Sequence, residues 1–142
     1  MANYPEYQVA PMREELVRAG FTQLMSPGDV DRALERPGTT LLVVNSVCGC
    51  AAAGARPGVI HALQGRGLRF DHLVTVFAGM ETEATRRARD YFEGAAPSSP
   101  QVAILRDGRL VRLLGRETFL ERSPEAIAEE LAAAAETAGI TA

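Results

Sequence analysis

Residues 39–50, TTLLVVNSVCGC, join a continuous apolar run to the only two cysteines of the chain. The β-branched and apolar residues 39–45 are typical of a strand that is buried on both faces. The alanine-rich stretch 50–64 follows at once and predicts a helix, which Pro57 must kink or interrupt. The two cysteines therefore stand where a buried strand ends and a helix begins.

The segments downstream continue this alternation and close with a hairpin. Residues 71–78 predict a second buried strand and residues 81–92 a second helix. Two further strands, 101–106 and 109–114, are joined by an Asp-Gly turn, which is a strong hairpin signal, and a last helix begins at Ser123. From residue 39 the order is β-α-β-α-β-β-α. This order predicts an α/β protein of thioredoxin-like fold, with a central mixed four-stranded sheet flanked by helices.

Two helices are predicted before the first strand. Pro11 and Gly20 delimit the first of them, and Ser26 is placed to cap the second, which spans 26–36. With 142 residues the chain has the length of one domain. We therefore expect a single thioredoxin-like domain over 1–142, in which residues 1–38 form an N-terminal helical extension and residues 39–142 form the thioredoxin core.

Composition narrows the range of partners and compartments. The formal charge is −3, so electrostatics favour neither nucleic acid nor an anionic membrane as a partner. No stretch approaches the roughly 20 apolar residues of a membrane span, and the N-terminus has no signal-peptide core. We expect a cytoplasmic protein. In that reducing compartment a cysteine pair is catalytic more often than structural.

The spacing of Cys48, Gly49 and Cys50 suits reversible redox chemistry. A disulfide across one residue closes so short a loop that it adds little stability and strains its own geometry. At the start of a helix the free N–H groups and the helix dipole favour thiolate over thiol, which lowers the pKa of Cys48. We therefore predict Cys48 as the nucleophile and Cys50, inside the first helical turn, as the resolving thiol.

Four other residues are candidates for substrate binding. Pro100 precedes the third predicted core strand, where thioredoxin-like proteins carry a cis-proline against the active-site sulfur, and the backbone of Ser99 would be free to pair with an extended substrate. A plain loop is the alternative there. Asn45, beside the cysteines, could hydrogen-bond a sulfur or a bound thiol, or simply belong to the loop. Arg56 could attract a carboxylate-bearing thiol, or form a structural ion pair.

The chain resembles the bacilliredoxin family. The residues that carry the resemblance are 43–52, VVNSVCGCAA, with Ala55-Arg56-Pro57 behind them, and three further segments, 4–21, 74–79 and 91–100. The stretch 115–118, GRET, departs from the family in lacking a histidine, and Ala53-Gly54 also differs from the family pattern.

The resemblance implies thiol-disulfide exchange in the cytosol, with Cys48 as nucleophile and Cys50 as resolving thiol. The reaction it implies removes bacillithiol from S-thiolated proteins, and some members are described as disulfide isomerases. No tightly bound cofactor is implied. Bacillithiol or a similar low-molecular-weight thiol would be the co-substrate, and S-thiolated cytosolic proteins and a flavin-dependent disulfide reductase the partners.

Two alternative functions of the cysteine pair, metal binding and redox sensing, stay open. Two thiolates could hold copper(I) or zinc, although metal sites normally have three or four ligands, and His61 and His72 are distant in sequence from the cysteines. We therefore predict no metal site. Alternatively, the pair could act as a redox sensor that changes shape without turnover.

Overall fold

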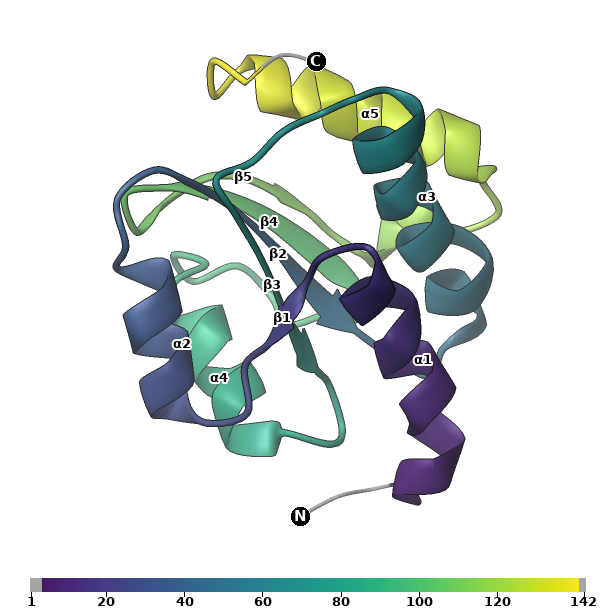
Figure 1. Ribbon diagram of the computed structural model, residues 1–142, viewed down its shortest axis with the longest axis vertical. Helices are drawn as coiled ribbons and strands as arrows, with labels where there is room; N and C mark the ends of the chain where they lie inside the picture. Colours follow the sequence, from purple (N-terminus) through teal and green to yellow (C-terminus); the bar gives the residue numbers. More distant parts are fainter. Residues whose placement is uncertain (1–3, 141–142) are drawn as a thin grey trace.

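A five-stranded mixed sheet forms the centre of the protein, and the computed structural model describes residues 4–140 (Figure 1). The strand order is β1-β3-β2-β4-β5. The β1–β3 and β2–β3 pairs are parallel, whereas β2–β4 and β4–β5 are antiparallel. The strands are β1 Thr22–Gln23, β2 Thr39–Asn45, β3 His72–Phe77, β4 Gln101–Arg106 and β5 Arg109–Leu114.

The predicted thioredoxin arrangement is confirmed, but the sheet has five strands and not four. The additional strand, β1, comes from the N-terminal segment and pairs with β3 through Thr22↔Val74 and Gln23↔Thr75. Two residues are too few to show a period of two, so no local pattern could predict this strand.

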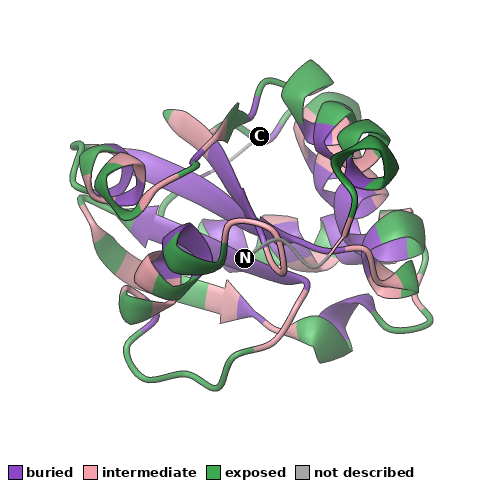
Figure 2. Cartoon of the chain, turned by 90° about the horizontal axis from the view of Figure 1, so that it is seen from below, coloured by how far each residue is buried: buried purple, intermediate pink, exposed green. Residues whose placement is uncertain are grey.

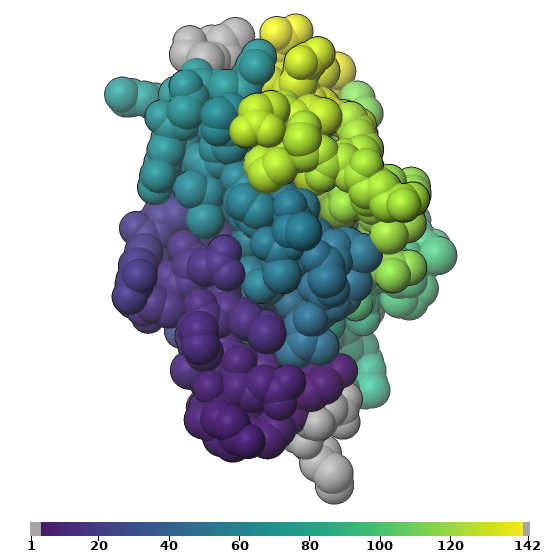
Figure 3. Space-filling view, turned by 90° about the vertical axis from the view of Figure 1, so that its right-hand side faces the viewer, coloured from purple at the N-terminus to yellow at the C-terminus, as the bar shows by residue number. Residues whose placement is uncertain are grey.

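Helices cover both faces of the sheet. On one face lie α1 (Glu6–Arg18), α3 (Arg56–Ile60) and α5 (Pro124–Glu136), and on the other lie α2 (Pro27–Leu34) and α4 (Thr82–Asp90). Figure 3 shows α1, the helical segment around α3, and α5 side by side. No helix within residues 4–140 has the length and apolar character needed to cross a membrane.

Strand β2 divides the hydrophobic core into two clusters because its side chains alternate between the faces. Leu41 and Val43 belong to the cluster under α1, α3 and α5, whereas Leu42 and Val44 belong to the cluster under α2 and α4. All seven residues of β2 are buried, as the purple centre of Figure 2 shows. The continuous apolar run is thus explained by a strand that is covered on both sides.

The first helix begins earlier than the sequence predicts. It starts at Glu6, so that Pro11 lies inside it rather than at its start. Proline removes one hydrogen bond from a helix, but Val9 and Leu16 on either side of it are fully buried. Tertiary packing therefore stabilises a helix that local rules would begin at the proline.

The helix starts predicted at Ser26 and Ser123 are confirmed by their caps. The Oγ atoms of Ser26 and Ser123 accept hydrogen bonds from the N–H groups three residues later, each at 3.1 Å. The helix predicted at 50–64 is continuous through Pro57, with π-helical turns η1 (Ala51–Ala55) before α3 and η2 (His61–Gly65) after it. Pro57 has no N–H, and it lies where the π-helical turns of η1 pass into α3.

Candidate active site

Cys48 and Cys50 are free thiols whose sulfur atoms lie 3.1 Å apart, and both residues are partly exposed. The carbonyl of Cys48 accepts hydrogen bonds from the N–H groups of Ala51 at 3.0 Å and Ala52 at 3.2 Å, so the helical segment starts at this residue. The N–H of Cys50 points at the Cys48 sulfur, 3.3 Å away. Cys48 thus occupies the helix-initiating position expected from the sequence.

The turn between β2 and the cysteines is braced by two polar side chains. Ser46 Oγ accepts a hydrogen bond from the Cys48 N–H at 3.1 Å, and Asn45 Oδ1 accepts one from the Ser46 N–H at 2.8 Å. The Asn45 amide also donates to the Met12 carbonyl of α1 at 3.2 Å. These bonds fix the backbone that presents Cys48.

Arg56 lies beneath this turn rather than on its surface. Its side chain is 2% exposed and donates from Nη1 to Asn45 Oδ1 at 2.9 Å and to the Ser46 carbonyl at 2.8 Å. Its Nε donates to Glu15 Oε1 of α1 at 3.0 Å. Since Asn45 is also buried, at 1% exposed, the structure places both residues out of reach of a substrate. This placement favours a positioning role over the direct contact with a bound thiol that the sequence suggests.

The segment containing Ser99 and Pro100 begins β4 at the same end of the sheet. Val44 pairs with Gln101, so the next residues, Asn45 and Pro100, are neighbours across the two strands. The Ser99–Pro100 peptide bond is cis, as expected from the fold. Pro100 is buried and Ser99 is partly exposed. Of these two, Ser99 is the residue that a substrate can reach.

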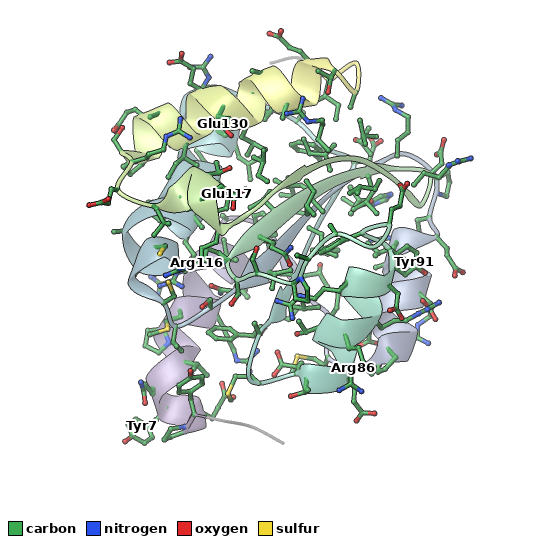
Figure 4. The ribbon with its side chains drawn as sticks, turned by 180° about the vertical axis from the view of Figure 1, so that it is seen from behind. Tyr7, Arg86, Tyr91, Arg116, Glu117 and Glu130 are labelled. Carbon is green, nitrogen blue, oxygen red and sulfur yellow. The ribbon has the colours of Figure 1, made fainter. Side chains whose placement is uncertain are left out.

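Arg116 is a neighbour of the thiols that the sequence did not reveal. It begins the short 3₁₀ helix η3 (Arg116–Phe119), and Figure 4 shows its position on the side of the molecule that carries α3. Its exposed guanidinium lies near enough to the two cysteines for the thiols to raise the pKa of Arg116. Its backbone N–H donates to Ser98 Oγ at 3.3 Å, which joins the η3 turn to the segment before β4.

A glycine makes this approach possible. A Cβ atom on Gly54 in η1 would lie 2.8 Å from the Phe119 carbonyl oxygen, so η3 can approach η1 only because residue 54 has no side chain. The one sequence signal was that 115–118 departs from the family pattern while containing a basic residue. Arg116 is more than sixty positions from Cys48 in sequence, so its proximity could not be predicted.

The environment gives the two thiols opposite pKa shifts. Partial burial opposes ionisation of Cys48, but hydrogen bonds from the Cys50 thiol, the Cys50 N–H, Arg116 and the Ala51 N–H outweigh burial and lower the pKa of Cys48. The hydrogen bond to Cys48, partial burial and the charge on Cys48 raise the pKa of Cys50, and Arg116 opposes them. The favoured state is a thiolate at Cys48 with the proton kept on Cys50.

The histidines lie outside this cluster. His72 Nε2 is 3.0 Å from the Pro37 carbonyl, at the opposite end of the sheet from the thiols, and His61 lies at the start of η2. Between residues 4 and 140, no three or more His, Cys, Asp and Glu side chains form a group able to hold a metal ion. The described site therefore offers two sulfur ligands and one guanidinium.

A thioredoxin-type sheet with a dithiol at the start of its first core helix defines a thiol-disulfide oxidoreductase class. A solved structure of an oxidoreductase with a thioredoxin fold superposes with a TM-score of 0.63 at 14% identity, covering 79% of this chain and 94% of that one, which supports the fold. A family model described as disulphide isomerase matches residues 4–138.

Relatives with about 50% sequence identity show which family within that class the chain belongs to. A bacilliredoxin of Geobacillus kaustophilus is 51% identical over 132 residues, covering 92% of this chain and 90% of that protein. A bacilliredoxin of Cytophaga hutchinsonii is 48% identical over 128 residues, covering 90% and 94%. The chain belongs to the bacilliredoxin family.

Proposed function

We propose that this protein removes bacillithiol, or a similar low-molecular-weight thiol, from mixed disulfides on cytosolic proteins. The observation that carries the proposal is the asymmetry of the dithiol. Cys48 has a lowered pKa and is partly exposed, and a protonated thiol lies 3.1 Å away on Cys50. A thiolate is the attacking species in disulfide exchange, and the adjacent thiol is placed for a second attack.

In the first step the Cys48 thiolate attacks the small-thiol sulfur of the mixed disulfide. A new S–S bond forms between Cys48 and the small thiol while the old S–S bond breaks. Its electron pair leaves on the cysteine sulfur of the substrate protein, which then takes up a proton from water. The substrate protein is restored, and Cys48 carries the small thiol.

The second step has two possible attacking thiols. A second molecule of the small thiol could attack the adduct sulfur and regenerate Cys48 directly. Alternatively, Cys50 loses its proton and attacks Cys48, which expels the small thiol and leaves an internal disulfide. Two electrons from a disulfide reductase, such as a flavin-dependent one, would then restore the dithiol.

In this mechanism Arg116 and the helix start have separate roles. The N–H groups of Cys50 and Ala51 stabilise the Cys48 thiolate by hydrogen bonds, and Arg116 adds a permanent positive charge. As an exposed guanidinium beside the sulfurs, Arg116 is also placed to meet a carboxylate on an incoming small thiol. Arg116 is therefore better placed than the buried Arg56 to attract a carboxylate-bearing thiol, which is the role that the sequence suggested for Arg56.

Disulfide isomerisation is the second candidate, because the matching family model carries that description. The first step would be the same attack by Cys48, but on a protein disulfide, and the released protein thiol would then attack elsewhere in the same chain. Recovery of activity from a scrambled disulfide protein, in the absence of any small thiol, would distinguish this reaction from removal of a small thiol.

The test uses a protein thiol blocked in turn by bacillithiol, glutathione or coenzyme A. Cys48→Ala should abolish release of the protein thiol. Cys50→Ala should still react, and mass spectrometry should find the small thiol attached to Cys48. The two variants are each other's matched control, since each keeps one thiol. Release by Cys48→Ala together with loss of release in Cys50→Ala would reverse the assigned roles, and wild-type inactivity on all three substrates would reject the proposal.

A further inference from the structure

A pocket of about 430 Å³ lies on the face of the sheet opposite α3. One wall is a single face of α4, formed by residues at helical spacing, and the other wall is the loop that precedes β4. The residues that matter are Thr82, Thr85, Arg86 and Arg89 on the helix and Ala95 and Pro97 on the loop. In Figure 4 Arg86 lies well apart from Arg116, so this pocket is separate from the thiol site.

Arg89 is a half-buried cation that has no counter-ion among residues 4–140. Its Nε donates to Gln101 Oε1 at 3.2 Å and its Nη2 to the Ser98 carbonyl at 2.7 Å, and both acceptors are neutral. Burial lowers the pKa of Arg89, and no carboxylate opposes that effect. The positive charge at the base of this pocket is therefore uncompensated by the described part of the chain.

Arg86 stands one turn earlier on the same face of α4 and adds a second positive charge. It makes no hydrogen bond or ion pair within residues 4–140, and it is exposed. Asp90, the carboxylate among the described residues that line the pocket, pairs with Arg87 at 3.3 Å. Two like charges three residues apart repel each other and destabilise a helix, unless an anion lies between them.

The hydroxyl of Thr85, in the lining of the same pocket, also lacks a partner among the described residues. Thr85 is 3% exposed, and its Oγ1 is the one buried side-chain polar atom of residues 4–140 without a hydrogen-bond partner. Buried hydroxyls are nearly always hydrogen-bonded, because an unpaired one costs stability. Thr85 lines the pocket beside Arg86 and Arg89, and a ligand oxygen that reached its hydroxyl would satisfy it.

We propose that this pocket binds an oxyanion, namely a carboxylate or phosphate group of a small molecule. Two guanidinium groups and a hydroxyl offer several donors, and charge-assisted hydrogen bonds of this kind are the strong ones. The binding neutralises Arg86 and Arg89 and satisfies Thr85 at the same time. It involves no thiol chemistry and does not depend on the reaction proposed for the dithiol.

The test is a titration with inorganic phosphate and with succinate, followed by two-dimensional amide NMR at constant ionic strength set by sodium chloride. We expect saturable shifts at amides of residues 79–97 with at least one of the two anions. Thr85→Val keeps the shape of the side chain and removes no hydrogen bond, so the fold should be retained while the Kd rises. Loss of one charge-assisted hydrogen bond corresponds to a rise of about tenfold, which we expect for Thr85→Val and for Arg86→Gln.

Arg112→Gln in β5 is the matched control, because it removes one exposed arginine elsewhere on the chain and should leave the Kd unchanged. Saturation by phosphate alone would identify a phosphate site, and saturation by succinate alone a carboxylate site. The proposal is overturned if neither anion saturates, or if Arg112→Gln weakens binding as much as Arg86→Gln does.

Discussion

At the scale of single residues, one glycine separates two thiols that have opposite acid–base behaviour. Cys48 is surrounded by donors, namely the N–H groups of Cys50 and Ala51 and the guanidinium of Arg116. The Cys50 thiol donates a hydrogen bond to the Cys48 sulfur, and this bond raises the pKa of Cys50, so Cys50 stays protonated. Position in the helix contributes to this asymmetry, since the residue that starts a helix faces the N–H groups of the first turn and Cys50, two residues later, does not. Arg116 adds to the stabilisation of the Cys48 thiolate.

Replacing Arg116 with Gln should raise the pKa of Cys48, because a positive charge and a hydrogen bond to the thiolate are both lost. Only the thiolate is alkylated, so the rate with iodoacetamide at neutral pH should fall several-fold and its pH profile should move to higher pH. Peptide mass spectrometry would confirm that Cys48 is the residue modified.

Arg116→Lys should recover part of this effect, because it keeps the charge but not the planar donor geometry. Arg112→Gln should leave the profile unchanged. If Arg116→Gln has the wild-type profile, the arginine does not stabilise the thiolate, and the backbone N–H groups alone account for the lowered pKa.

At the scale of elements, the position of Arg116 depends on how closely η3 packs against η1. Gly54 permits that contact, and the neighbouring Gly58 permits an equally close one, because a Cβ there would lie 2.5 Å from Ile127 Cγ2 of α5. Two glycines four residues apart thus bring one face of the helical segment against η3 and α5. The segment carries Cys48 and Cys50 at its start, so its packing also sets the surroundings of the thiols.

Gly54→Ala should therefore affect both stability and reactivity. The added Cβ would lie 2.8 Å from the Phe119 carbonyl oxygen, and backbone cannot give way as a flexible side chain can. We expect the free energy of unfolding to fall by roughly 1–3 kcal/mol, as for other overpacked sites, and the alkylation profile of Cys48 to move in the same direction as in Arg116→Gln. Urea denaturation and the alkylation assay measure the two effects.

Gly28→Ala in α2 is a suitable control. The nearest atoms to its Cβ belong to the exposed Arg32 guanidinium, at 3.2 Å, which can move aside. Its stability should equal or exceed that of the wild type, since alanine favours helix over glycine. Wild-type stability in Gly54→Ala would mean that η3 is free to shift and does not hold Arg116 in place.

At the scale of the whole molecule, the N-terminal segment is built into both the core and the sheet. Leu16 and Phe21 pack in the cluster under α3 and α5. Arg13 donates to Glu81 Oε2 at 2.6 Å and to Gln23 Oε1 at 2.9 Å, which ties α1 to the turn before α4 and to β1. The described part of the N-terminal segment thus packs on the thioredoxin core through apolar and charged contacts.

Deleting residues 1–21 should abolish cooperative folding, because it removes the fully buried Val9 and Leu16 and leaves Glu81 without Arg13. Loss of each large buried side chain typically costs about 2–5 kcal/mol. The loss of two or more of them exceeds the total free energy of unfolding of many domains. Far-ultraviolet circular dichroism during urea denaturation should show no sharp transition. The intact chain should unfold in one transition.

Tyr7→Ala provides the control, since Tyr7 lies on α1 but is 83% exposed, and its loss should change stability by less than about 0.5 kcal/mol. A truncated chain that unfolds at the wild-type urea midpoint would show that α1 is dispensable and that residues 22–142 fold alone.

The sequence by itself predicted the elements of the thioredoxin core and the place of the cysteine pair at a helix start. Strand β2, the hairpin of β4 and β5, the serine caps and the helix start at Cys48 all follow from patterns within about ten residues, where periodicity and capping act. Only the tertiary structure decided the fifth strand, the burial of Arg56, the approach of Arg116 and the pocket on α4. Those features depend on contacts between segments far apart in the chain, and contacts of that kind leave no local periodicity to detect.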